Sequence, residues 1–168
     1  MGTSPSELSR QLREGVGPDL ARRRGIVGLS LAAMGSMGLV TLYQMGILRR
    51  LPEPPLPHFD AECVDASAEA YAALAMPDGA LALMSYAVTL ALAAAGGAER
   101  ARDRPWLPLA LAAKVAFDTA EAVRLTADQW TKHRAFCFWC LLAAGATVAT
   151  APLAAAEAVA AARRLARG

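Results

Sequence analysis

Aromatic residues are scarce in this chain, and their scarcity narrows the range of possible fold classes. They make up 6% of the 168 residues, although 55% of the residues are hydrophobic. The apolar content is therefore mostly alanine, leucine and valine. Alanine and leucine favour helices, whereas sheets are enriched in aromatic and β-branched residues. The composition predicts an all-α protein, and the length predicts a single domain.

A strong charge of one sign is also lacking. The formal net charge is +2, and no run of lysine and arginine alternates with aromatic residues, as it does on surfaces that bind nucleic acid. We therefore expect no nucleic-acid partner. Charge is absent altogether from residues 25–48, which end at Arg49 and Arg50. Because about 20 apolar residues cross a bilayer core, this stretch is predicted to span a membrane.

The hydropathy pattern predicts three further membrane spans, and hence an integral membrane protein built as a four-helix bundle. The predicted spans cover residues 25–48, 78–95, 106–126 and 135–156 of a bundle that occupies 25–160. The polar remainder consists of an N-terminal tail (1–24), an outer loop (49–77) and a basic C-terminal tail (161–168).

The third predicted span is unusual because it carries charges. Lys114, Asp118 and Glu121 fall on one face of a helix. Charges within a membrane segment are costly and usually face the bundle interior. One interpretation is a proton path to a redox partner. The other is structural: either a paired cluster, or simply a helix end that lies in the membrane interface.

Arginine clusters predict the orientation of the bundle. The N-terminal tail carries five arginines, the turn at 96–105 carries three and the C-terminal tail carries three. Four spans place all three segments on one side, which the positive-inside rule makes cytoplasmic, with both termini. The outer loop then lies on the opposite side, where bacteria permit disulfides. We expect a multi-pass protein of the cell inner membrane, in contact with lipid.

Cysteine is nearly absent, yet two of the three cysteines stand at C-x-x-C spacing. Cys137 and Cys140 are predicted to lie at the start of the last span, while Cys63 lies in the outer loop. Residues three apart share a helix face, so these two thiols can form a disulfide. The free N–H groups of a helix start favour a thiolate on Cys137. Redox chemistry is therefore the preferred interpretation.

Two alternatives to redox chemistry involve the same cysteines. The pair can be two small apolar residues of a membrane helix, without chemistry. A zinc site is the other alternative, and it needs about four ligands. The side chains that could supply them are Cys63, Cys137, Cys140, His58 and His133. We expect no metal, and we expect His58 to be a solvated loop residue.

The motif in its setting resembles the vitamin K epoxide reductase family. The likeness covers about residues 26–160 and is most specific at 133–143, HRAFCFWCLLA, where the family has its redox C-x-x-C at the outer start of the last bundle helix. A second part, 71–86, contains Met76-Pro77 and Ser85-Tyr86 and looks like the family's loop helix leading into the second span. Members of this family are membrane thiol oxidoreductases with four helices around a quinone.

The resemblance implies roles for individual residues. Cys140 would face the quinone, ubiquinone or menaquinone, with Tyr86 and Ser85 as further contacts, while Cys137 would exchange disulfides with a partner. Cys63 matches the second of two loop cysteines that carry electrons to the motif. The chain lacks the first, so either Cys63 forms a mixed disulfide with Cys137, or an external thiol protein reaches Cys137 directly.

Two further positions depart from the family pattern. Ala82 replaces a glycine that is usual in the second span, and Ala144 stands one turn after Cys140, where a tyrosine is expected. These departures bear on the quinone contacts.

The predicted function is that of a membrane thiol–disulfide oxidoreductase. It would pass electrons between the thiols of a periplasmic thioredoxin-like protein and a quinone, and so support disulfide formation outside the cytoplasm. The alternative, motivated by the missing loop cysteine, is a family member that has lost turnover and acts as a membrane scaffold or redox-sensing subunit.

Overall fold

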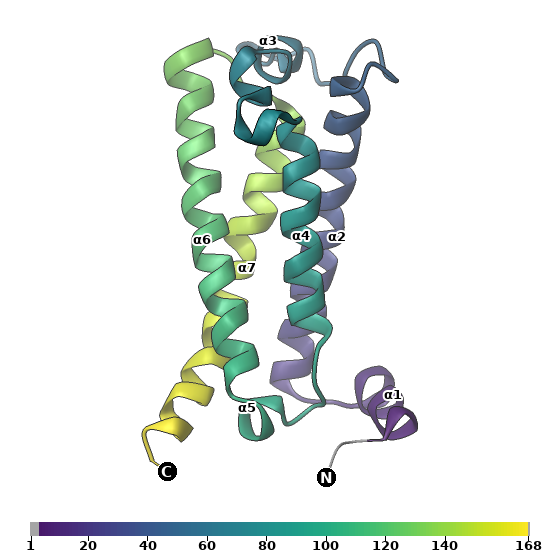
Figure 1. The fold of residues 1–168 in the computed structure, drawn as a ribbon, viewed down its shortest axis with the longest axis vertical. Coiled ribbons are helices and arrows are strands. Elements are labelled where there is room, and N and C mark those ends of the chain that lie inside the picture. Colours follow the sequence, from purple (N-terminus) through teal and green to yellow (C-terminus); the bar gives the residue numbers. More distant parts are fainter. Residues whose placement is uncertain (1–3, 168) are drawn as a thin grey trace.

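The computed structural model describes residues 4–167, which are largely helical. Four long helices lie side by side along the molecule (Figure 1), and α7 packs against both α2 and α6, while α4 packs mainly on α2. The four are α2 (Pro18–Gln44), α4 (Asp78–Ala94), α6 (Trp106–Asp128) and α7 (Phe138–Leu165). The predicted all-α fold is confirmed.

Short helical elements fill the connections between the long helices. They are α1 (Pro5–Glu14), α3 (Ala61–Asp65), the 3₁₀ turns η1 (Ala68–Tyr71) and η2 (Ala73–Ala75), α5 (Arg100–Asp103) and the π-helical turn η3 (Gln129–His133). The N-terminal tail thus contains a helix from residue 5, although residues 1–3 of that tail lie outside the described range. The end of the outer loop thus forms two 3₁₀ turns, η1 and η2, rather than one continuous helix.

Both ends of the chain lie at one end of the bundle, together with α1 and α5, whereas α3 lies at the opposite end (Figure 1). The three arginine-bearing segments therefore share one end, as an even number of passes along the bundle requires. The side of the membrane on which that end lies stays a prediction.

Two of the long helices, α2 and α7, are long and apolar enough to cross a membrane by length and composition. The helix α4 is apolar but shorter. Large apolar side chains are nevertheless exposed on all four, at Leu31, Met84, Phe117 and Val148. Outward-facing apolar side chains of this kind suit a surface that contacts lipid.

The helices extend beyond the predicted spans at several ends. The helix α2 begins at Pro18, because proline is well tolerated at the first helical position, and it continues through the three arginines at 22–24. The helix α7 begins three residues later than its predicted span, at Phe138, and runs to Leu165. Its buried face is lined by small residues, which allow close packing of neighbouring helices. They include Ala143, Thr147, Thr150, Ala154, Ala158 and Ala161.

Charges on α6 form a paired cluster against α4. The Lys114 ammonium donates to Asp118 Oδ1 at 2.6 Å and to Ser85 Oγ at 2.7 Å. Both charged side chains are largely shielded, with exposures of 20% and 11%. This pairing supports the structural interpretation. Glu121 is not part of this cluster, because it pairs with Arg124 on the exposed surface.

A second ion pair lies near the end of the bundle that holds the termini, and it is fully buried. The Arg100 guanidinium donates to both carboxylate oxygens of Glu157 at 2.7 Å. It also donates to carbonyl oxygens at the C-terminus of α4, including that of Leu92 at 2.6 Å. Arg23 donates to further carbonyls there, including that of Ala93 at 2.8 Å. Two arginines therefore satisfy the free carbonyl groups that end this helix.

Candidate functional site

The C-x-x-C motif begins α7 rather than lying within it. Cys137 is the N-cap residue, and its Sγ accepts a hydrogen bond from the Cys140 backbone N–H at 3.2 Å. The Cys137 N–H donates in turn to Gln129 Oε1 at 2.9 Å. Cys137 is completely buried, whereas Cys140 is partly exposed. A sulfur at this position lies where the free N–H groups and partial positive charge of the helix start stabilise a thiolate.

Backbone hydrogen bonds hold the outer loop against the residue that precedes the motif. The Phe136 N–H donates to the His58 carbonyl at 2.7 Å, and the Asp60 N–H donates to the Phe136 carbonyl at 3.0 Å. These bonds explain why the helix starts late, since Phe136 is extended and bridged to Phe59. His58 is exposed, as expected, yet its ring lies edge-on to Trp130 with the centroids 5.3 Å apart.

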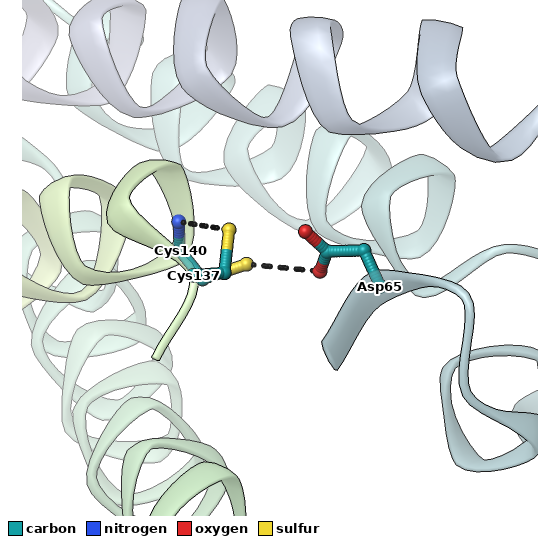
Figure 2. Close-up of side chains that lie close together, drawn as sticks. All are labelled: Asp65, Cys137 and Cys140. Carbon is teal, nitrogen blue, oxygen red and sulfur yellow. Dashed lines mark hydrogen bonds between the residues drawn. The ribbon is translucent and has the colours of Figure 1, made fainter. Parts of the chain in front are cut away.

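The same attachment places α3 beside the thiols. Asp60 caps α3 by accepting the Cys63 N–H at 2.9 Å. Five residues later, Asp65 ends the helix with its carboxyl group directed at the motif (Figure 2). The Cys140 thiol donates to Asp65 Oδ1, with 3.3 Å between sulfur and oxygen. A carboxyl group and two thiols from distant parts of the sequence therefore form one cluster.

The Asp65 carboxyl group is 1% exposed, and burial raises its pKa from 3.8 to about 6. Hydrogen bonds from Cys137 and Cys140 act in the opposite direction, because they stabilise the carboxylate. Repulsion from the carboxyl groups of Asp78 and Glu53 adds to the increase. A group that titrates near neutral pH beside a thiol is suited to exchanging protons with it.

Gln44, the last residue of α2, fixes the position of Asp65. Its amide donates to the Asp65 carbonyl at 3.2 Å and to Asp78 Oδ1 at 2.7 Å, and it accepts the Gly79 N–H at 3.2 Å. A β-carbon on Gly79 would lie 2.9 Å from the Gln44 amide oxygen, so glycine permits this approach. One side chain thus joins α2, α3 and α4 next to the thiols.

A pocket of about 160 Å³ opens beside Cys140. Its lining is mostly apolar and includes Met37 of α2, Ala82 and Tyr86 of α4, and Ala143 and Ala144 of α7. Its polar groups include Asp65, Asp78, Asp128, Gln129, Lys132 and His133. The Tyr86 hydroxyl lies 2.8 Å from Thr147 Oγ1, which orients the ring.

The donor atoms of Asp65, Cys137 and Cys140 all lie within 4.8 Å of one another. A structural zinc site commonly has four protein ligands. The other candidates from the sequence, Cys63, His58 and His133, do not belong to this group of three. The arrangement therefore resembles a thiol pair with an acid more than the four-ligand site that we considered.

Comparison with known protein families assigns the chain to one of them. The family model described as "Vitamin K epoxide reductase family" matches residues 25–155. The chain belongs to this family. No curated protein matches it. Membership confirms the resemblance seen in the sequence and makes the chain a membrane protein with thiol–disulfide oxidoreductase activity as its general class. The family is generally linked to quinones and to thioredoxin-like partners.

Within this family fold, the predicted site residues separate into three places. Cys137 and Cys140 lie together, and Tyr86 lines the pocket beside Cys140. Cys63 is exposed on α3 and is unpaired in the structure. Ser85 does not line the pocket but bonds to Lys114 and Asp118 between α4 and α6. Both departures from the family pattern, Ala82 and Ala144, line the pocket wall.

Sequence reasoning missed Asp65 and Gln129. Both lie in polar segments, where a carboxylate or amide is usually solvated. Asp65 stands two residues after Cys63, which is the one sequence signal that connects it to the redox residues. Its burial depends on hydrogen bonds between residues more than 70 positions apart, which no local pattern records.

The raised pKa of Asp65 predicts a specific pH dependence of stability. Since the folded chain holds this proton more tightly than the unfolded chain, ionisation reduces stability as pH rises from about 4 to about 6. At 1.36 kcal/mol per pKa unit, the loss is on the order of 2–3 kcal/mol. Asp65→Asn removes this ionisation. We therefore expect the melting temperature of the variant, relative to that of the wild type, to increase between pH 4 and about pH 7.

Glu62→Gln is the matched control for that comparison. Glu62 lies on the same short helix but is exposed, so its loss removes the same charge without changing a buried group. Thermal unfolding in detergent across the pH range measures both variants. A difference between Asp65→Asn and wild type that is constant with pH would contradict the raised pKa.

Proposed function

We propose that this chain oxidises protein thiols and passes their two electrons to a quinone through Cys137 and Cys140. One observation carries the proposal: the two thiols lie together at the start of α7, and Cys140 lines a pocket that is largely apolar. Thiols that face such a pocket can transfer electrons to an apolar acceptor dissolved in the membrane.

The pocket walls fit a quinone ring. A flat, apolar ring needs small or aromatic apolar neighbours on its faces and a few polar groups at its edge. Ala82, Ala143 and Ala144 leave room near Cys140, and the ring of Tyr86 adds an aromatic wall. Lys132 and His133 also line the pocket and supply hydrogen-bond donors suited to the carbonyl oxygens of such a ring. Ser85 has no part in this pocket.

When bound, a quinone accepts two electrons and two protons and leaves as the hydroquinone. The residues of the chain prepare that transfer. Cys137 caps the start of α7, and the free N–H groups there favour its sulfur as the attacking and leaving group in thiol–disulfide exchange. Cys140 is held toward the pocket by α7, and Asp65 accepts the hydrogen bond of its thiol. The Cys137–Cys140 disulfide is the oxidised product.

Entry of electrons from a partner protein is proposed to occur through Cys63. Cys137, expected to exchange disulfides with the partner, is completely buried beneath the outer loop, so an external protein cannot touch it in this conformation. Cys63 is exposed on that loop and is therefore the accessible thiol. Of the two routes left open by the missing loop cysteine, burial favours a mixed disulfide between Cys63 and Cys137.

The proposed setting is the cell inner membrane, with α2, α4, α6 and α7 as four spans and both termini cytoplasmic. The arginine-bearing segments at one end of the bundle support this orientation. It places all three cysteines on the periplasmic side, where a thioredoxin-like protein can meet Cys63 and disulfides persist.

Anaerobic quinone titration of the reduced Cys63→Ser variant tests the proposal. This variant retains only the Cys137–Cys140 pair. Because one dithiol supplies two electrons, we expect each chain to reduce one short-chain quinone, followed by its absorbance. The same variant should fail to oxidise the thiols of a thioredoxin-like protein. Reduction of no quinone would overturn the proposed transfer, and normal oxidation of the protein thiols would overturn the entry route through Cys63.

A further inference from the structure

Asp65 is a buried carboxyl group in direct contact with a redox thiol. Its Oδ1 accepts the hydrogen bond of the Cys140 thiol at 3.3 Å (Figure 2). Its Oδ2 is buried and has no hydrogen-bond partner within residues 4–167. A buried carboxylate with an unpaired oxygen is costly, and the cost is avoided if that oxygen carries a proton.

Oxidation of the thiol pair changes this contact. The Cys140 sulfur bears a hydrogen only while the pair is reduced, and a disulfide has no hydrogen to donate. Disulfide formation therefore removes the hydrogen bond that stabilises the Asp65 carboxylate. The carboxylate would then lie 1% exposed with neither oxygen of its side chain bonded to a thiol. Binding a proton neutralises it and restores a stable state.

We propose that Asp65 takes up the proton of the Cys140 thiol when the Cys137–Cys140 disulfide forms, and returns it when the disulfide is reduced. This inference rests on the proposed redox role of the pair. It assigns to Asp65 the part of a proton acceptor that touches the reacting sulfur. The outer loop supplies the carboxylate that accepts the proton, and α7 supplies the thiols.

Disulfide formation changes three bonds and releases two electrons. Two S–H bonds break, one S–S bond forms, and two electrons pass to the oxidant, which is a quinone in the membrane or a disulfide reagent in solution. Two protons leave the sulfurs. Asp65 keeps the proton of Cys140, so the protein releases only one proton for each two electrons, and the oxidant takes its second proton from water. Reduction reverses each change.

Other charged groups face Asp65 in both redox states. The carboxyl groups of Asp78 on α4 and Glu53 in the outer loop raise its affinity for a proton, and they remain when the disulfide forms. Tyr43 on α2 interacts with it electrostatically, and Asp128, Lys132 and His133 line the same pocket. Among the groups hydrogen-bonded to the Asp65 carboxyl, the thiols are the ones whose donor disappears on oxidation.

Equilibration with glutathione at several pH values tests this proton count without any quinone. Reduction of glutathione disulfide consumes two protons, so an oxidation that releases one proton makes the equilibrium constant fall tenfold per pH unit. We expect that slope in the Cys63→Ser protein just above about pH 6, where Asp65 is ionised in the reduced state, and no slope below about pH 5.

Asp65→Asn, made in the same Cys63→Ser background, should release both protons and give an equilibrium constant that does not vary with pH up to about 8. Glu62→Gln, which removes an exposed charge from the same helix, should retain the tenfold slope. If Asp65→Asn does not fold, the change of slope near pH 6 in the protein that retains Asp65 is itself the test.

A constant that is independent of pH in the presence of Asp65, or an equal slope after Asp65→Asn, would overturn the inference. These outcomes are separate from those of the quinone titration. A pair that shows the slope but ignores quinone would refute the proposed acceptor and leave the proton transfer intact. A pair that reduces quinone without the slope would do the reverse.

Discussion

We expect Cys137→Ser and Cys140→Ser each to abolish quinone reduction, because a serine hydroxyl can neither supply electrons nor form a disulfide. The loss should be complete, to the background rate, as is usual when one member of a reacting pair is removed. Neither change should prevent folding. Serine is a favoured N-cap residue and can accept the residue-140 N–H in place of Cys137 Sγ. At position 140 it can donate to Asp65 as the thiol does.

Leu142→Ser provides the matched control for these variants. Leu142 lies on the same first turns of α7 but is 46% exposed and is not among the residues that line the pocket. We expect this variant to reduce quinone at the wild-type rate, measured by absorbance with equal amounts of folded protein. Retained turnover in either cysteine variant would show that electrons reach the quinone by a route that does not use the pair.

The largest effect on stability is expected from Glu157→Gln. This change leaves the Arg100 guanidinium charged and buried, with side-chain exposures of 0% and 3% for the two partners. Breaking a buried pair by removing one charge costs about 3–5 kcal/mol. The cost has a structural consequence, because Arg100 also holds the carbonyl groups at the end of α4. A large fall in melting temperature in detergent is the expected result.

Glu121→Gln is the control for that experiment. Its partner Arg124 is 56% exposed, so the ion pair is worth less than about 1 kcal/mol. Equal melting temperatures for Glu157→Gln and Glu121→Gln would mean that the Arg100 pair is not a structural element of the bundle.

Much of the fold was predictable because its signals are local. Composition indicated helices, and the arginine clusters indicated which segments share one end, since hydropathy and charge are read residue by residue. Arg100 shows where such reasoning stops. In the sequence it is one of several arginines in a charged turn, yet in the structure it is completely buried. The carboxylate that pairs with it there, Glu157, lies 57 positions away. Nothing near Arg100 in the sequence distinguishes it from Arg102.

The sequence predicted the two cysteines of the site but not its buried carboxyl group, Asp65. The spacing of Cys137 and Cys140 identified the pair, and the turn that begins α7 brings them together. Asp65 reaches them only because backbone bonds join His58 and Asp60 to Phe136, and because Gln44 holds its carbonyl. Those contacts depend on the packing of three helices, so a sequence pattern shows an acidic loop residue and no more.

Differential thiol labelling in native membranes tests the central claim most directly. Free thiols are alkylated with one reagent, disulfides are reduced and alkylated with a second, and mass spectrometry reads Cys63, Cys137 and Cys140 separately, with and without added quinone. The proposed function predicts that quinone converts Cys137 and Cys140 together from thiols to a disulfide. Thiols that remain unchanged by quinone would contradict it and favour a membrane scaffold or redox-sensing subunit that has lost turnover.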